Sequence, residues 1–392
     1  MGAKMTSLYR NRDLQMIFGV TLMAIVGLAL ISPALPKVQD AFDLSKTQIG
    51  LMVTIFTIPG VIVSPLVGFI SDKWNRKGMV IVSLLVFSLS GGSIAFLRDY
   101  NMILVMRFFQ GAAASGLSTL SMALIGDAFT GHDRAVAMGY NASVLSVGSA
   151  SYPVIGGLMA SVAWFFPFYF FFLAIPISLV ILKYMHIPTE RNDGDYKSYL
   201  VMASRELYNK KFVVLISACI VSFIILYGPY MTYFPLYLDE VYGSDSFDIG
   251  IILAFMSITT GIISYHSGKI HKRIGSNIPM VIGFVFYSLA MVVMYLMTDA
   301  YVGILAACLY GVGQGFNIPI LQTKFLNSVS DETRGVVSAL FSSNLRLGQS
   351  IGPVLMGVLY TIDGYELVFL FSAALSISMG MVTLFAIKRK LI

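Results

Sequence analysis

The sequence has few charged residues and very little cysteine or histidine. Charged residues make up 12% of the 392 residues, about half of the quarter that is usual in a soluble domain. With 57% hydrophobic residues, the chain has too little polar surface to cover itself in water, which excludes an ordinary soluble protein. The 2 cysteines and 4 histidines lack the spacing of a metal site or a disulfide framework, and no Walker loop is present. We therefore expect a membrane protein that is not an enzyme and holds no cofactor.

Long hydrophobic runs predict twelve membrane-spanning helices, and hence an all-α membrane protein. A helix that crosses the hydrocarbon core needs roughly 20 mostly apolar residues. Runs of this length, bounded by charges and turn residues, cover residues 15–36, 47–70, 79–97, 102–125, 135–160, 165–185, 212–236, 247–267, 278–297, 302–326, 335–361 and 366–387.

The basic residues predict how these helices are oriented. Most of the 26 Lys and Arg residues fall in the loops and tails of one side, whereas the other side holds only Lys37, Lys46 and Arg98. Cytoplasmic loops carry the excess of Lys and Arg, so we expect both ends of the chain in the cytoplasm. Because the basic residues lie in short loops between apolar runs, the net charge of +6 indicates the lipid bilayer as partner and not nucleic acid.

The chain repeats itself after a shift of 200 residues, which aligns Gly50 with Gly250 and Pro153 with Pro353. A repeat of this length is a duplicated half, and two similar halves in a transporter surround a central pathway. The expected domains are an N-terminal six-helix bundle (1–185), a cytoplasmic central linker (186–211) and a C-terminal six-helix bundle (212–392).

The loop after the second run carries a motif that resembles the major facilitator superfamily. The matching residues are Gly68, Asp72, Lys73, Arg76 and Lys77, while Asn75 stands where the family usually has glycine. The resemblance implies that Asp72 caps a helix of the other half, here near Gly335, and holds one state of a gate. We expect Asp127 to lie within reach of Arg76. The equivalent loop of the second half has Lys272 in place of the acid, which predicts an asymmetric gate.

Two further patterns extend the resemblance over the whole chain. The fourth run carries Arg107, Gln110 and Gly111 in the R-x-x-Q-G spacing of the family. The fifth and eleventh runs carry glycine–proline patterns, Gly148, Pro153 and Gly157 in the first half and Gly348, Gly352, Pro353 and Gly357 in the second. Glycines allow backbones to approach closely, and proline bends a helix. The spacing is similar to that of the twelve-helix bacterial drug:proton antiporters. The resemblance implies multidrug efflux across the inner membrane of a bacterium, driven by a proton gradient.

Ionisable residues inside the predicted spans are few. Arg346 falls near the middle of its run and Arg107 nearer the outer boundary, and intramembrane charges are functional candidates by default. Backbone carbonyls could partner Arg107 instead. No carboxylate falls in the middle of a run, where many antiporters of the family have one. The alternative function is therefore export or exchange of an organic anion, metabolite or lipid-like molecule that contacts Arg346, without obligatory proton coupling.

Polar and aromatic residues on the same runs complete the predicted pathway for a small amphiphilic substrate. Pockets for such molecules are mostly apolar with a few placed polar groups. Besides the two arginines, the candidates are Gln110, Asn141, Tyr230, Tyr233, Gln314, Asn317 and Asn344. We expect the transporter to act as a monomer.

Overall fold

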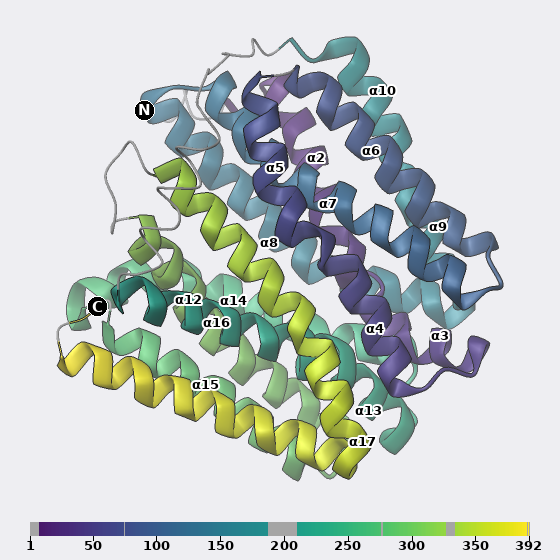
Figure 1. The fold of residues 1–392 in the computed structure, drawn as a ribbon, viewed down its shortest axis with the longest axis vertical. Coiled ribbons are helices and arrows are strands. Elements are labelled where there is room, and N and C mark those ends of the chain that lie inside the picture. Colours follow the sequence, from purple (N-terminus) through teal and green to yellow (C-terminus); the bar gives the residue numbers. More distant parts are fainter. Residues whose placement is uncertain are drawn as a thin grey trace.

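The computed structural model describes residues 8–73, 75–186, 210–275, 277–326, 334–389 and 391. These residues form an all-helical protein (Figure 1). The predicted central linker falls outside the described residues except for His186, Lys210 and Lys211.

The first half of the chain contains long helices interrupted by short 3-10 segments. Helix α2 starts at Arg12 because the Asn11 side chain accepts the amide proton of Leu14 (3.2 Å), which satisfies a donor that the helix cannot. The elements of this half are α2 (Arg12–Ala29), η1 (Ser32–Ala34), α3 (Leu35–Phe42), α4 (Lys46–Thr57), α5 (Pro59–Lys73), α6 (Arg76–Ser93), η2 (Ile94–Phe96), α7 (Tyr100–Ala128), α8 (Gly131–Val162), α9 (Phe166–Tyr169), η3 (Phe170–Leu173) and α10 (Ala174–Tyr184).

The second half is built from fewer and longer elements than the first. Where α2 is followed by a 3-10 turn, α12 continues into the π-helical segment η4, which contains Pro229. Proline lacks the amide proton of a regular helical turn, and the wider π turn accommodates it. The elements are α12 (Lys210–Ile225), η4 (Leu226–Tyr233), α13 (Phe234–Tyr242), α14 (Ser246–Ile274), α15 (Asn277–Leu296), α16 (Val302–Leu326) and α17 (Arg334–Lys388).

Eleven helical segments among the described residues are long and apolar enough to cross a membrane. The last segment, Phe341–Lys388, has 48 residues, about twice the length that one crossing needs. It is interrupted at Asp363 and at Gly364, whose φ of 58° is left-handed and easy only for glycine. The protein is a multi-pass membrane protein.

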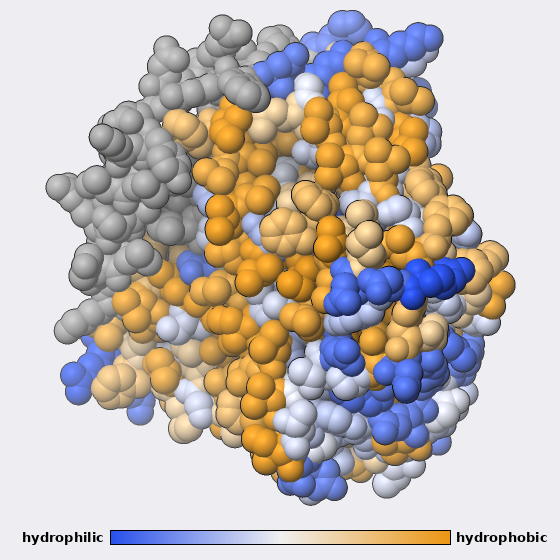
Figure 2. Space-filling view, turned by 45° about the vertical axis from the view of Figure 1, so that its right-hand side comes forward, coloured by the Kyte–Doolittle hydropathy of each residue, from blue (hydrophilic) through white to orange (hydrophobic). Residues whose placement is uncertain are grey.

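Large hydrophobic side chains cover much of the outer surface of the protein. Figure 2 shows them over the middle of one face, with hydrophilic residues gathered at its top and lower right. Ile62, Val82 and Leu296 are each exposed by 60% or more. Water would penalise such a surface, whereas lipid tails are a suitable solvent for it.

The short helices α3 and α13 pack against one another at one end of the protein, at the lower right of Figure 1. The marked ends of the chain lie at the opposite side (Figure 1). The capping box formed by Ser45 and Gln48 starts α4 at this first end. The helices α4 and α14, which follow α3 and α13 in the two halves, start near this end. Each makes a close backbone contact with the opposite half, which is described below.

Candidate functional site

A cavity of about 380 Å³ lies between the two halves of the chain. Its walls come from α2, α4, α7 and α8 of the first half and from α12, η4, α14, α16 and α17 of the second. Most lining side chains are apolar or carry hydroxyl groups. The only charged or amide side chains among the described lining residues are Gln314, Arg346 and Gln349.

The lining residues of the two halves occupy equivalent positions of the repeat. A shift of 200 residues relates five pairs, and both members of each pair line the cavity: Phe56 and Met256, Ser118 and Ile318, Leu145 and Leu345, Ser146 and Arg346, and Ser149 and Gln349. The cavity therefore lies where the internal symmetry of the chain predicts a central pathway.

Two backbone seams close one end of the space between the halves. A Cβ atom on Gly50 of α4 would lie 2.9 Å from the carbonyl oxygen of Pro353 in α17. On Gly250 of α14 it would lie 2.3 Å from the carbonyl oxygen of Pro153 in α8. Real side chains do not approach backbone this closely, so only glycine allows these contacts. The two seams are equivalent under the repeat.

The other glycines of the predicted patterns have similar packing roles. A Cβ on Gly157 would lie 2.2 Å from the carbonyl oxygen of Ser246, which extends the α8–α14 seam. Gly148 packs on side chains of α2, and Gly352 packs on the backbone of α12 and η4, each within its own half. The pattern thus serves contacts within and between the halves.

Beside the seams, an ion pair joins the two halves. Lys46 Nζ lies 2.8 Å from Glu240 Oε2, and Tyr365 donates a hydrogen bond of 2.7 Å to the same carboxylate. Lys46 also donates to Gln39 (2.8 Å), while Tyr233 donates to the Lys46 carbonyl (3.3 Å). The side chains of Lys46 and Glu240 are 12% and 47% exposed. We call this pair the Lys46–Glu240 latch.

Hydroxyl groups tie the halves together nearer the cavity. Thr54 of α4 donates to the Ser350 carbonyl of α17 (2.9 Å). Ser257 of α14 donates to the Ser149 carbonyl of α8 (3.0 Å). Ser32 of the first half donates to the Met231 carbonyl of η4. These three bonds join the two halves beside the cavity.

Arg346 lines the cavity, as its position in the middle of an apolar run predicted. Its Nη1 atom donates to Gln349 Oε1 (3.2 Å) on the next turn of α17. A Cβ on Gly60 would lie 2.9 Å from Arg346 Cδ, so the arginine extends along α5 of the opposite half. None of the described lining residues is Asp or Glu, so the positive charge has no acidic partner in this wall.

Gln314 is the second predicted pathway residue that reaches the cavity. Tyr287 of α15 donates a hydrogen bond to its Oε1 atom. The Tyr287 ring stacks on Tyr310 (centroids 4.7 Å apart), and Tyr310 stacks on Tyr230 (4.8 Å). Tyr230 itself is fully buried and donates to the Leu253 carbonyl (3.2 Å). It therefore supports the wall from behind and does not line the cavity.

Arg107 and Gln110 lie away from the cavity, packed inside the first half. Arg107 is 1% exposed, and its Nη1 atom donates to the Gly27 carbonyl (3.1 Å) and to Gln110 Oε1 (3.0 Å). Its guanidinium lies 5.5 Å from the ring centre of Phe56 and 5.2 Å from that of Phe168. Carbonyl pairing, one of the two expectations for Arg107, is what the structure shows.

The three predicted asparagines also lie outside the cavity lining. Asn141 accepts a hydrogen bond from Thr21 (2.7 Å) at the contact of α2 with α8. Asn317 is fully buried against Gly283, and among the described residues neither of its amide atoms has a hydrogen-bond partner. The Asn344 amide nitrogen also lacks a partner.

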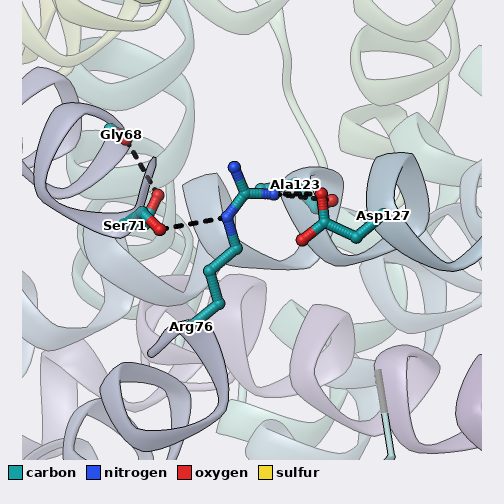
Figure 3. Close-up of polar contacts among 5 residues, drawn as sticks. All are labelled: Gly68, Ser71, Arg76, Ala123 and Asp127. Atoms are coloured by element: carbon teal, nitrogen blue, oxygen red, sulfur yellow. Dashed lines mark hydrogen bonds and ion pairs between the residues drawn. The ribbon is translucent and has the colours of Figure 1, made fainter. Parts of the chain in front are cut away.

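At the opposite end of the first half, Arg76 and Asp127 form a compact charge cluster (Figure 3). Arg76 Nη1 contacts Asp127 Oδ1 at 2.5 Å, and its Nε donates to the Ser71 carbonyl (3.2 Å). The Ser71 hydroxyl in turn donates to the Gly68 carbonyl (2.8 Å). The predicted proximity of Arg76 and Asp127 is confirmed, and the cluster ties α6 to the ends of α5 and α7.

Parts of the predicted gate lie outside the described residues. The backbone of Asp72 belongs to α5, but its side chain and that of Lys272 are not described, and neither are the surroundings of Gly335. The role of Asp72 as a cap on the other half therefore stays a prediction. Lys77 donates to the Met185 carbonyl (2.9 Å), which links α6 to the end of α10.

Gln349 and the Lys46–Glu240 latch were missed by sequence reasoning. The repeat and the helical period would have found Gln349, since it follows Arg346 by three residues and thus shares its face of the helix. The latch has a weaker signal, because a lysine and a glutamate in outer loops are ordinary solvated residues until the fold brings them together.

The chain matches the family described as Major Facilitator Superfamily over residues 17–352. The bacillibactin exporter of Bacillus subtilis is 25% identical over 388 residues, which cover 95% of each chain. Multidrug resistance protein 1 of the same organism is 27% identical and covers 90% of this chain and 91% of its own. Quinolone resistance protein NorA of Staphylococcus aureus is 23% identical with the same coverage.

Solved structures give the same fold at lower identity. The nucleoside transporter NupG superposes with a TM-score of 0.80 at 15% identity, over 96% of this chain and all of its own. A bacterial homologue of the human lysosomal transporter Spinster superposes with a TM-score of 0.75 at 14% identity, over 96% and 95%. At this identity the likeness concerns the arrangement of the helices alone.

Proposed function

The chain belongs to the Major Facilitator Superfamily, and we propose that it exports small amphiphilic molecules, drugs among them, by alternating access and in exchange for protons. The observation that carries this proposal is the cavity between the two halves, closed at one end by two equivalent backbone seams. Sites at the interface of two repeats are typical of transporters that rock one half against the other. Relatives that share over 90% of their length with this chain include multidrug and quinolone resistance proteins.

We propose twelve membrane crossings, with α17 crossing twice around its break at Asp363 and Gly364. Twelve crossings place both ends of the chain on the same side of the membrane, and the distribution of Lys and Arg makes this side the cytoplasm. The protein is then a monomer in the cytoplasmic membrane of a bacterium, made of the two six-helix bundles 1–185 and 212–392. The seams and the Lys46–Glu240 latch lie on the outer side, so the described conformation is closed to the outside.

The Arg76–Asp127 cluster is the proposed gate on the cytoplasmic side, together with Asp72. A partly buried ion pair fixes the relative positions of α5, α6 and α7, so these helices move as one body. Asp72 lies on the last turn of α5, and in this proposal it contacts the other half when the cytoplasmic side closes.

The second candidate function is export or exchange of an organic anion, metabolite or lipid-like molecule, without obligatory proton coupling. Arg346 favours it, because its charge faces a cavity in which no described lining residue is acidic. An uncompensated charge in an apolar site is costly unless a ligand pairs with it.

Everted membrane vesicles with an acid lumen separate the two candidates. A pH-sensitive dye in the lumen follows the addition of cationic, neutral and anionic amphiphiles to the outside. Alkalinisation of the lumen, absent from vesicles without the protein, establishes proton antiport. Variants at Asp40, Asp43, Asp72 and Asp127 then identify the proton carrier.

Movement of a labelled anion into the vesicles without any pH change establishes the second function. Arg346→Met should abolish this movement and Arg346→Lys should preserve part of it, because lysine keeps the charge but not the planar set of donors. If neither protons nor any labelled amphiphile move, the export proposal is wrong.

A further inference from the structure

The N–H groups that face the cavity are held in place by a second layer of hydrogen bonds. Arg346 donates through Nη1 to Gln349 Oε1, and arginine has only donors. The Gln349 amide is therefore fixed with its oxygen toward the arginine. Its nitrogen bonds to none of the described residues but keeps some accessible surface. Because Gln349 lines the cavity, this nitrogen is accessible from there.

Gln314 is fixed in the same way from behind the wall. Tyr287 donates to its Oε1 atom, so the amide nitrogen is directed away from Tyr287. This nitrogen too has no partner among the described residues and keeps some accessible surface. Gln314 lines the cavity, so its nitrogen is also accessible from there. Tyr287 cannot swing away, because its ring is fully buried and stacked on Tyr310.

Three hydroxyl groups of the α14 wall do not compete as donors. Ser257 donates its proton to the Ser149 carbonyl (3.0 Å) and Thr260 to the Gly311 carbonyl (3.2 Å). Ser264 donates to the Gly315 carbonyl (3.4 Å). These oxygens offer lone pairs to the cavity, whereas the free N–H groups come from α16 and α17.

We propose that Gln314, Gln349 and Arg346 form an oxyanion site, and that Tyr287 is the positioning residue that keeps the Gln314 amide nitrogen toward it. The substrate class is an amphiphile with a carboxylate or another oxyanion, and its apolar part lies along the walls of the first half. This inference rests on the proposed transport function and specifies what the cavity binds. Without Tyr287 the Gln314 amide can turn and present its oxygen, which repels an anion.

A binding measurement tests the site independently of transport. The purified protein is placed in nanodiscs, and fluorescence titrations use three dansyl probes: 11-(dansylamino)undecanoic acid, its methyl ester and dansylcadaverine, which is cationic. Empty nanodiscs supply the background. We expect the acid to bind at least tenfold more tightly than the ester, with the amine weakest. Equal affinity for acid and ester would refute the oxyanion site and leave the transport proposal standing.

Tyr287→Phe keeps the stacked ring and removes only the hydroxyl. We expect the acid-to-ester preference to fall about three- to tenfold, as for the loss of one hydrogen bond to a charged or polar partner. Tyr310→Phe is the matched control, since its hydroxyl in the same stack bonds to the Ser222 carbonyl (3.4 Å) and does not touch Gln314. Equal losses in the two variants would assign Tyr287 a merely structural role and overturn the proposal for it.

Gln314→Glu neutralises the net charge of the site while keeping its shape, because the new carboxylate offsets the Arg346 cation. Tyr287 still donates to one carboxylate oxygen, and the other oxygen faces the cavity. The variant should therefore lose most of its preference for the acid over the amine; an unchanged preference for the acid overturns the assignment of Gln314. If either variant fails to yield folded protein, Gln314→Met serves in its place, because methionine lacks the amide but keeps the length. This variant should bind the acid more weakly and the ester with unchanged affinity. Equal weakening of both probes by Gln314→Met would refute the role of the amide.

Discussion

Replacement of Lys46 by methionine should open the end of the protein that the latch holds closed. Methionine keeps much of the length and the apolar stem of lysine but removes the cation. The change breaks the 2.8 Å contact with Glu240 and the 2.8 Å bond to Gln39. It leaves the bond from Tyr365 to Glu240 and the glycine seams intact. The variant therefore isolates the charge that ties the first half to the second.

The size of the effect follows from the exposure of the pair. Fully exposed ion pairs contribute about 0.2–1 kcal/mol, and hydrogen bonds to charged groups contribute about 1.5–3 kcal/mol. Lys46 is 12% exposed and Glu240 is 47% exposed, so the latch lies between these cases, at about 1–2 kcal/mol. Because the latch exists only in the closed state, its loss should raise the open-to-closed ratio by about 5- to 30-fold.

Distances between spin labels measure this ratio. Ala41 at the end of α3 and Val241 at the end of α13 are both exposed, belong to different halves and are equivalent under the repeat. Labels at these positions, with Cys219 and Cys308 replaced by alanine, should show one short distance in the parent protein. Lys46→Met should add a longer distance.

Two controls make the result specific. Arg98→Met removes another cation of the first half, whose partners are the Ala95 and Leu97 carbonyls and the rings of Trp164 and Phe165, all in its own half, and it should leave the distances unchanged. The exchange Lys46→Glu with Glu240→Lys should restore the short distance. An unchanged distribution in Lys46→Met would refute the latch, and so would the same shift in Arg98→Met.

Three further changes test other parts of the structure by thermal unfolding of the purified protein. Gly250→Ala places a Cβ against the backbone of the facing helix and should destabilise the protein by about 1–3 kcal/mol, whereas Gly139→Ala, which meets nothing within 4 Å, should not; equal effects would contradict the seam. Asp127→Asn should lower stability by about 2 kcal/mol or more, because it removes the anionic partner of a largely buried ion pair, and an unaltered unfolding temperature would show that the cluster is not structural. Asn317→Leu should leave stability unchanged or raise it, because it removes two buried atoms without partners; a marked loss would show that the amide has a partner.

Hydrophobic runs predicted the helices well but not their ends. The first predicted run, 15–36, continues through η1 and α3 to Phe42. Pro33 and Pro36 each lie at the start of a short helical segment, where a missing amide proton costs nothing. The helices α3 and α13 extend past the ends of the predicted apolar runs 15–36 and 212–236. They lie at the closed end of the protein.

The arginines show why the site could be predicted only in part. Arg107 and Arg346 are equally unusual in apolar runs, but only Arg346 lines the cavity. The difference depends on which helix face meets the other half. Arg107 points into its own half, where the Gly27 carbonyl and two aromatic rings pair with it. Periodicity within one helix does not contain this information, because it comes from the packing of six helices.

The repeat explains the shape of the cavity, and departures from the repeat explain its chemistry. The equivalent seams at Gly50 and Gly250 require matching backbones, and here the two halves agree. On the same faces, Ser146 and Ser149 stand where the second half has Arg346 and Gln349. A symmetric scaffold that rocks about its centre thus holds its strong donors on one wall only. In the proposed transport cycle, a substrate bound there would keep its contacts with the second half while the first half moves past it.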